Sequence, residues 1–259
     1  MTWCVNSDST PAIKADPKTA DRLAMGQLHF VIPAHNESGS VGKVVREALT
    51  LYPQAFVVVV DDGSSDQTAV NAQNAGARVV SLPFNCGYGA ALQAGLVYAE
   101  RRNASQVVTL DADGQHDPGE IAHLLVPLEN DAADIVIGSR YLDHGAQYRV
   151  PFARRAGAMA FSALVSSITG RHVTDPTSGF QAMNAGALSV IARLCDFPEK
   201  SPDADLLVYS HRRGLRLAEV PVKMYADTGC DSMHGFLRSL FYVPNMLIAL
   251  TGVLLSPGK

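Results

Sequence analysis

The sequence predicts an α/β fold in which a mostly parallel, doubly wound sheet is flanked by helices. Between residues 28 and 110, the pattern of strand, loop and helix repeats about four times. The strands are almost continuously apolar, as in FVVVV at 56–60, which is typical of strands covered by helices on both faces. Most of them end in a polar motif, and ligands of such sheets bind beyond the carboxyl ends of the strands.

The elements follow from apolar runs and periodic positions taken in order. The first strand is expected at 28–32, where an apolar run stops at Pro33, and Ser38 or Ser40 is expected to cap the next helix. Further strands are expected at 56–60, 78–82, 107–110, 134–141 and 215–222. Further helices are expected at about 67–75, 90–99, 120–128, 154–168, 185–194 and 203–214, with a compact turn at 174–180.

Composition places the chain among globular proteins and excludes several classes of function. The chain has 259 residues, is 47% hydrophobic and carries a formal net charge of −4, which gives no general attraction to nucleic acid. Its four cysteines lie far apart without metal-site spacing, so we expect reduced thiols in a cytosolic protein. No signal peptide or uninterrupted membrane span is evident, and residues 1–26 are expected to form a flexible leader.

The motif DADGQHDP at 111–118 follows a buried strand and carries three carboxylates within seven residues, namely Asp111, Asp113 and Asp117. Carboxylates so close together repel one another unless a cation or a shared proton relieves them. An Asp-Ala-Asp pair beyond a strand end offers oxygen ligands to Mg²⁺ or Mn²⁺, with coordination positions left for substrate phosphates. The alternative is an acidic surface loop without a ligand.

Two further polar motifs are expected at the same edge of the sheet. Residues 33–37 end the first strand and residues 61–66 end the second, so both should meet residues 111–115 in one crevice. No GxGxxG follows the first strand and no Walker lysine motif is present, which argues against a Rossmann dinucleotide site.

Six motifs together resemble family-2 glycosyltransferases, which have the GT-A fold with its Rossmann-like sheet. The resemblance covers about residues 28–225, and within the family it is greatest to the dolichol-phosphate mannosyltransferase branch and its polyprenyl-phosphate relatives. The motifs, in chain order, are IPAHNE (32–37), VVDDGSSDQT (59–68), NCGYGAALQAG (85–95), DADGQHDP (111–118), GSRY (138–141) and DPTSGFQAM (175–183). The resemblance implies a catalytic domain at 27–225.

On the donor side, the resemblance implies a nucleotide-sugar site containing Mg²⁺ or Mn²⁺. Asp111, Asp113 and Gln115 match the metal and diphosphate motif, and Asp61 or Asp62 matches the carboxylate that accepts a hydrogen bond from the base. The other matching nucleotide-binding positions are Pro33, Ala34, Glu37, Gly87, Gly89 and Ala112. The sugar and the base, GDP or UDP, stay open.

On the acceptor side, the resemblance implies a phosphate held by Arg140 and by Arg154 or Arg155, with Arg149 a weaker candidate. Arginine suits a phosphate because its planar fork forms paired hydrogen bonds. A sugar or lipid hydroxyl acceptor would instead need a carboxylate to take its proton. Asp175 is the first candidate for that base and Asp203 or Asp205 the others, although Asp175-Pro176 is equally consistent with a structural turn.

The segment 226–259 is expected to be an apolar or amphipathic helical tail that contacts a membrane surface. It contains a strongly apolar run at 236–255, interrupted by Pro244, and the alternative is packing on the domain or on a partner. We therefore predict an inverting hexosyltransferase at the cytoplasmic face of the membrane, peripherally attached, forming a homo-oligomer or pairing with a small membrane protein. Asp227 stands where relatives carry an arginine, so a nucleotide-sugar-binding pseudoenzyme and a hydroxyl-acceptor transferase stay as alternatives.

Overall fold

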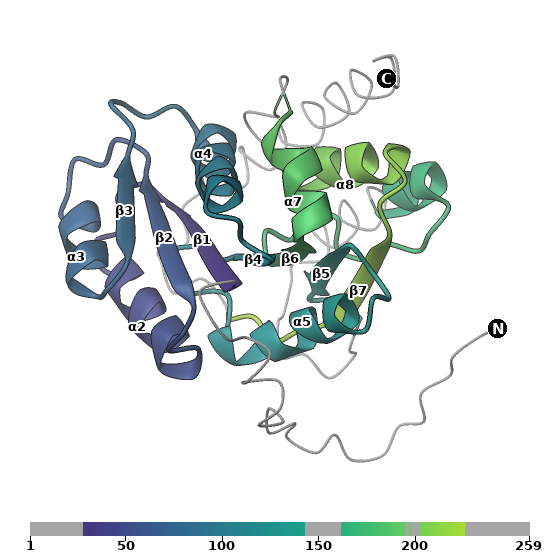
Figure 1. Cartoon of the computed structure of the whole chain (residues 1–259), viewed down its shortest axis with the longest axis horizontal. Coiled ribbons are helices and arrows are strands. Elements are labelled where there is room, and N and C mark those ends of the chain that lie inside the picture. Colours follow the sequence, from purple (N-terminus) through teal and green to yellow (C-terminus); the bar gives the residue numbers. More distant parts are fainter. Residues whose placement is uncertain (1–27, 143–161, 195–196, 198–201, 226–259) are drawn as a thin grey trace, which may run out of the picture.

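The computed structural model of the protein describes residues 28–142, 162–194, 197 and 202–225, and these residues form one twisted sheet flanked by helices (Figure 1). Its seven strands lie in the order β3-β2-β1-β4-β6-β5-β7. Their bounds are β1 Leu28–Ala34, β2 Phe56–Asp61, β3 Arg78–Ser81, β4 Gln106–Thr109, β5 Ile135–Ser139, β6 Gln181–Asn184 and β7 Leu217–Pro221. All pairings are parallel except those of β6, which runs antiparallel to both β4 and β5.

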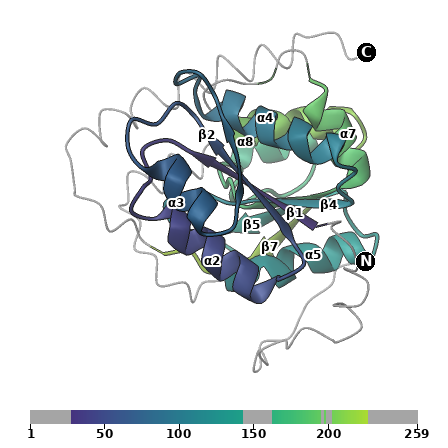
Figure 2. The ribbon, with the colours of Figure 1, turned by 60° about the vertical axis from the view of Figure 1, so that its left-hand side comes forward.

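Helices cover both faces of the sheet, as the continuous apolar strands predict (Figure 2). Their bounds are α2 Val41–Leu51, α3 Thr68–Asn74, α4 Tyr88–Arg101, α5 Ile121–Glu129, α7 Ala185–Ala192 and α8 Pro202–Arg212. Helices α2, α3 and α5 pack on one face, whereas α4, α7 and α8 pack on the other. The predicted mostly parallel α/β architecture is therefore confirmed.

Strand β1 is central to the core because every one of its residues is buried. Phe30 and Ile32 belong to the hydrophobic cluster under α2 and α5, and Val31 belongs to the cluster under α4. Side chains of a strand point alternately to opposite faces, so one strand supplies both cores. A Cβ on Gly95 of α4 would lie 2.3 Å from Cγ1 of Val31, so this glycine allows α4 to pack closely on the sheet.

Strand β6 is the main element that the sequence did not predict. Residues 181–184 pair with β4 on one side and with β5 on the other, so they close the gap between the two parts of the sheet. The strand has only four residues, QAMN, lying between a turn and a helix, which is too short for a visible alternation of apolar and polar positions.

Several predictions concern segments outside the described residues. These are the leader at 1–26, the arginines Arg149, Arg154 and Arg155, Asp227, and the tail at 226–259. Within the described ranges, no helix is both long enough and apolar enough to cross a membrane.

Candidate active site

The first two polar motifs meet at the carboxyl ends of β1 and β2, as predicted. Ala34 and Asp61 are paired residues at the ends of the two strands, and Asp62 N donates to Ala34 O at 2.8 Å. Glu37 N donates to Thr68 Oγ1 at 2.8 Å, which joins the two loops beyond the strands. Pro33 and Ala34 are buried in β1, so a bound nucleotide would contact this corner through the backbone and through Glu37.

Asp61 and Asp62, which the sequence could not distinguish, have different surroundings. Both oxygens of Asp62 accept backbone N–H groups, from Cys86 at 2.7 Å and Gly87 at 2.9 Å, and the residue is 3% exposed. Among the described residues, the one hydrogen bond to the Asp61 side chain comes from Ser64 N, at 3.2 Å to Oδ1. Asp62 therefore fixes the loop before α4, and Asp61 is the better candidate to accept a hydrogen bond from a base.

The loop that Asp62 fixes depends on glycine. Gly87 has φ +96°, a left-handed conformation that residues with a side chain adopt at a cost, and it directly precedes α4. Gly89 lies in the first turn of α4 and is buried. Both predicted glycines thus lie where the backbone of α4 begins, beside the loops that follow β1 and β2.

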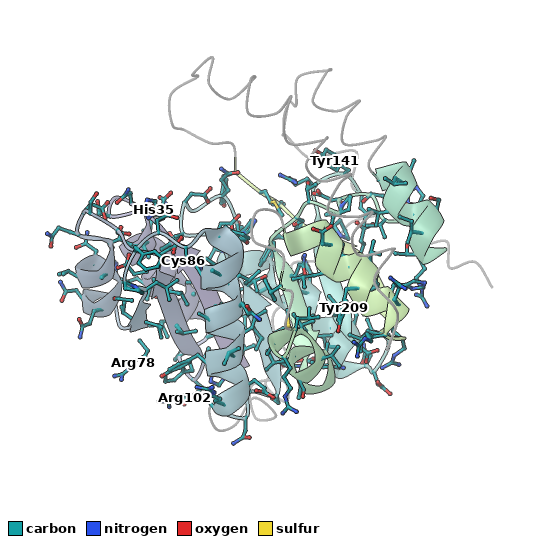
Figure 3. The ribbon with its side chains drawn as sticks, turned by 90° about the horizontal axis from the view of Figure 1, so that it is seen from above. His35, Arg78, Cys86, Arg102, Tyr141 and Tyr209 are labelled. Carbon is teal, nitrogen blue, oxygen red and sulfur yellow. The ribbon has the colours of Figure 1, made fainter. Side chains whose placement is uncertain are left out.

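His35 and Asn36 form an exposed rim that was not predicted from the sequence. His35 Nδ1 donates to Asp62 O at 2.8 Å, so the neutral ring has an acceptor at Nε2, which receives Asn36 Nδ2 at 3.0 Å. Asn36 adopts φ +56°, and its Oδ1 accepts from Ser65 N at 2.9 Å. Figure 3 shows His35 and Cys86 at the same rim. Both residues lie within the IPAHNE motif, but their contacts to the 62–65 loop are long-range and appear only in the fold.

The acidic loop after β4 keeps two carboxylates near each other. Asp113 Oδ1 accepts from Gln115 N at 2.9 Å, and Gly114 with φ +81° makes the turn between them. Burial raises the pKa of Asp113, and the neighbouring charges of Asp111 and Glu37 raise it further. A carboxylate in these surroundings favours a cation, which is the property expected of a metal ligand.

His116 and Tyr88 support Asp111 and were not identified from the sequence. Asp111 N donates to His116 Nδ1 at 3.0 Å, so the neutral ring carries its proton on Nε2, which lies 3.4 Å from Asp111 Oδ2. Tyr88 donates its hydroxyl to Asp111 Oδ1 at 3.4 Å. The buried His116 ring stacks on Phe180 at a centroid distance of 4.8 Å. Both oxygens of Asp111 thus have a protein neighbour that limits their rotation.

The residues of this loop fit a metal that is shared with a substrate. Within the described chain, no three His, Cys, Asp or Glu side chains already form a metal-binding group. Asp111 and Asp113 would therefore supply two of the ligands and a nucleotide diphosphate others, which is usual for Mg²⁺. The Ala112 side chain lies in the core, so Ala112 would contribute only its backbone.

Asp117 and Gln115 connect the acidic loop to the chain after β7. Tyr225 N donates to Gln115 O at 2.8 Å, and the Tyr225 hydroxyl donates to Asp117 Oδ2 at 2.7 Å. Asp117 Oδ1 also accepts from Gly119 N at 2.8 Å. Asp117 thus holds the start of the next helix and the chain after β7, and Asp111 and Asp113 are the acidic pair that the motif predicts.

Arg140 and Asp175 form a second charged centre, beyond the end of β5. Arg140 donates from Nε to Asp175 Oδ2 at 2.7 Å and from Nη2 to Asp175 Oδ1 at 2.8 Å. Asp175 is fully buried, and it also accepts from Arg140 N at 3.1 Å. Because Arg140 occupies both oxygens of Asp175, the geometry favours the structural alternative over the base role that the sequence suggested for Asp175.

The turn at 174–180 connects this centre with the acidic loop. Asp175 is near its start, and Gly179 near its end is so close to Asp111 that a Cβ would lie 3.4 Å from Asp111 Oδ1 and 2.9 Å from the Tyr88 hydroxyl oxygen. Thr109 of β4 donates its hydroxyl to Gly179 O. One short turn therefore spans from the Arg140 pair to the predicted metal ligand.

The remaining candidate base, Asp205, lies in α8. Its side chain is 2% exposed, its Oδ1 has no hydrogen-bond partner, and burial raises its pKa from 3.8 to about 6. No described contact joins Asp205 to the Arg140 pair or to the acidic loop. The side chain of Asp203 lies outside the described residues.

Comparison with known proteins identifies the family. The sequence model of glycosyl transferase family 2 matches residues 29–191, so the chain belongs to this family and is a glycosyltransferase. The predicted family resemblance is confirmed.

Curated relatives lie in the predicted branch. The chain is 30% identical to the UDP-N-acetylglucosamine–dolichyl-phosphate N-acetylglucosaminyltransferase of Methanococcus voltae, over 86% of this chain and 95% of the relative. It is 34% identical to the dolichyl-phosphate hexose transferase of Haloferax volcanii, over 81% of this chain and 87% of the relative.

Solved structures share the fold. Glucosyl-3-phosphoglycerate synthase from Mycobacterium tuberculosis, in complex with Mn²⁺, UDP and glucosyl-3-phosphoglycerate, matches with a TM-score of 0.68. The match covers 98% of this chain and 86% of that chain at 21% identity, so it shows the common architecture.

Proposed function

We propose that the protein transfers a hexose from a UDP- or GDP-sugar to a polyprenyl or dolichyl phosphate, with inversion at the anomeric carbon and with Mg²⁺ or Mn²⁺. The observation that carries the proposal is the turn 174–180, which brings a phosphate-binding type of residue, Arg140, onto the same edge of the sheet as the acidic pair Asp111 and Asp113. The names of the curated relatives support the lipid phosphate acceptor.

The donor would bind along the ends of β1, β2 and β4. In this proposal Asp61 accepts a hydrogen bond from the base, and the backbone at Pro33, Ala34, Gly87, Gly89 and Ala112 lies against the nucleotide, with Glu37 beside the ribose. Asp111 and Asp113, with Gln115 beside them, would hold the cation that binds the diphosphate. When bound, the cation offsets the negative charge that develops on the leaving diphosphate.

The acceptor would enter beside Arg140. A phosphate is already ionised near neutral pH, so the attack needs no general base. Two carboxylates of the described crevice are already engaged, since Asp62 is bound to two backbone amides and Asp175 to Arg140. In the proposal, Arg154 and Arg155 assist Arg140, and the 226–259 segment contacts the cytoplasmic face of the membrane, where the lipid lies.

A hydroxyl acceptor is the second candidate, and Asp205 is the observation that favours it. A carboxyl with a pKa of about 6 and an unpartnered oxygen has the basicity expected of a general base. Under this alternative, Asp205→Asn abolishes turnover. Under the lipid phosphate proposal, the same variant keeps activity within about threefold, which is less than 1 kcal/mol.

The decisive assay pairs two acceptors that differ only in the phosphate. Protein, Mg²⁺ or Mn²⁺ and a panel of labelled UDP- and GDP-sugars are incubated with polyprenyl phosphate or with the matching polyprenol. We expect a labelled glycolipid from the phosphate alone, with inverted anomeric configuration by NMR. Transfer to the polyprenol instead would favour the hydroxyl alternative, and donor binding without any transfer would favour a pseudoenzyme.

A further inference from the structure

Glu219, in the middle of β7, binds the backbone at the start of the turn 174–180. Its two oxygens accept Thr174 N at 2.9 and 2.8 Å, and Oε1 also accepts Asp175 N at 2.9 Å. The Thr174 hydroxyl donates to Oε2 at 3.1 Å. One carboxylate therefore fixes two consecutive residues of a turn that lies 44 positions or more away in the chain.

The residue that Glu219 fixes is the one that orients Arg140. Asp175 holds both the Nε and Nη2 edge of the guanidinium and the backbone N–H of Arg140. The direction of the Asp175 carboxylate depends on its backbone, and the Asp175 N–H is bonded to Glu219. The contacts thus run from Glu219 through Asp175 to Arg140 without a gap.

Strand register explains why Glu219 is a firm support. Ile137 of β5 pairs with Glu219 of β7, and Arg140 follows Ile137 by three positions on the same strand end. Both ends of the contact chain therefore belong to adjacent strands of one sheet, and the turn between them carries Asp175. The arrangement suits a guanidinium that must keep one orientation.

Glu219 and Asp175 place two carboxyl groups close together in a buried turn, where burial and like charge both disfavour ionisation. Burial raises the pKa of Glu219, and the nearby charge of Asp175 adds to this effect. Glutamine has a single acceptor oxygen, and its NH2 group would replace the second oxygen with a donor, so it cannot accept all of these N–H and O–H groups. Buried carboxyl groups with a perturbed pKa are found preferentially near functional sites, although structural networks perturb pKa values too.

We propose that Glu219 is a positioning residue for the acceptor phosphate, because it fixes the Asp175 turn and thereby the guanidinium of Arg140. That Arg140 binds the acceptor phosphate rests on the proposed function. The contact chain from Glu219 to Arg140 is independent of that function, so each part has its own test.

The first test observes Arg140 without turnover. The ¹⁵Nε–H signal of Arg140 is assigned by its loss in Arg140→Lys, and its hydrogen exchange is then compared between the wild type and Glu219→Gln. We expect exchange to be about tenfold faster or more in the variant, the equivalent of about 1.4 kcal/mol of lost protection. An unchanged exchange rate would overturn the proposal.

The second test uses kinetics with polyprenyl phosphate. Glu219→Gln should raise KM for the acceptor about tenfold while KM for the donor changes less than about twofold. The double variant with Arg140→Lys should be no worse than Arg140→Lys alone, because both changes act on one contact chain. Equal effects on the two substrates, or additive effects in the double variant, would contradict a positioning role.

A matched control exists at the opposite ends of the same strands. Asp134 before β5 binds Arg216 before β7, with Nε to Oδ2 at 3.1 Å and Nη2 to Oδ1 at 2.9 Å. Asp134→Asn should lower stability and leave the ratio of the two KM values unchanged. If Glu219→Gln does not give folded protein, Glu219→Asp withdraws the same oxygens and is expected to shift both readouts in the same direction.

Faster exchange of Arg140 in Glu219→Gln with an unchanged KM for the acceptor would overturn the proposal as well, because Arg140 would then be loosened without any effect on the acceptor. If Arg140 exchanges faster in Glu219→Gln but the wild type glycosylates no polyprenyl phosphate, the contact chain is supported and the acceptor part is overturned.

Discussion

The two parts of the sheet hold their charged residues in different ways. In the β2-β1-β4 part, short polar motifs follow each strand, and neighbouring loops bond to one another directly, as Asp62 does to Cys86 and Gly87. In the β6-β5-β7 part, Arg140 is held by Asp175, 35 positions away, and Asp175 by Glu219, another 44 positions on. The first part is a platform built from motifs at adjacent strand ends, and the second is a relay of contacts from Arg140 through Asp175 to Glu219.

This difference suggests that the two parts of the sheet bind different substrates. The platform suits a nucleotide and a cation, whose binding groups are placed by the strand ends themselves. The distant contacts suit an acceptor, because the same Arg140 can be tuned through residues that never touch the substrate. Variants in the two parts should therefore have separable effects, and the predictions below can contradict that separation.

The largest effect is expected at the acidic loop. Asp113→Ala should lower kcat/KM by about two orders of magnitude or more, because it removes a proposed ligand of the cation. The folding free energy should hardly change, because burial already raises the pKa of Asp113. Activity and thermal unfolding measure the two quantities. Asp117→Asn in the same loop is the control and should keep most of the activity.

Arg140→Lys should give the next largest effect, confined to the acceptor. Lysine keeps the charge but loses the planar fork that binds Asp175 at two points. We expect KM for polyprenyl phosphate to rise about tenfold, the value of one charge-assisted hydrogen bond of about 1.5 kcal/mol. Steady-state kinetics with each substrate varied in turn provide the measurement. A similar rise in KM for the nucleotide sugar would contradict the proposal that donor and acceptor bind to different parts of the sheet.

Asp205→Asn tests how stability depends on pH in the β6-β5-β7 part, where α8 packs. A carboxyl whose pKa is raised from 3.8 to about 6 in the folded state stabilises the fold when protonated. That contribution is complete below the unfolded pKa and is lost as the pH rises through about 6. Asp205→Asn should therefore raise the free energy of unfolding by up to roughly 3 kcal/mol at pH 8 and by little at pH 4. Denaturant unfolding at both pH values measures this change in the free energy of unfolding. An equal change at both would contradict a raised pKa of Asp205 in the folded protein.

Asp62→Asn tests the platform, and Asp61→Asn is its neighbouring comparison. The amide of asparagine would place a donor against one of the N–H groups of Cys86 and Gly87, which costs about 1–3 kcal/mol. We expect Asp62→Asn to lower the free energy of unfolding by that amount and Asp61→Asn to lower it less. Asp61→Asn should instead raise KM for the nucleotide sugar. If Asp61→Asn lowered stability more and Asp62→Asn raised KM for the nucleotide sugar, the assigned roles of the two residues would be wrong.

The sequence predicts the platform better than the distant contacts, for physical reasons. Continuous apolar strands and the motifs at their ends are local signals, so the parallel strands and the meeting of Pro33–Glu37 with Asp61–Asp66 follow from them. Strand β6 has four residues and no local signal. Asp61 and Asp62 differ only in which backbone amides come near, and that depends on the loop before α4.

Supporting residues are the hardest to predict because their partners are remote or face inward. His116 lies within a recognised motif, yet the hydrogen bond that it accepts from Asp111 N and its stacking on Phe180 require the fold. Asp175 is acidic and near the expected acceptor, which suggests a base until its bidentate contact with Arg140 is seen. Glu219 resembles any polar residue of an outer strand until the turn is placed against it.

The central claim is that Asp111 and Asp113 hold a cation against a nucleotide diphosphate at the ends of the strands. Crystals of the protein grown with Mn²⁺ and UDP or GDP would test it through the anomalous scattering of manganese. We predict a manganese peak within direct bonding distance of both carboxylates and of the diphosphate, with the base beside Asp61. A nucleotide bound elsewhere, or a metal that neither aspartate contacts, would contradict the account.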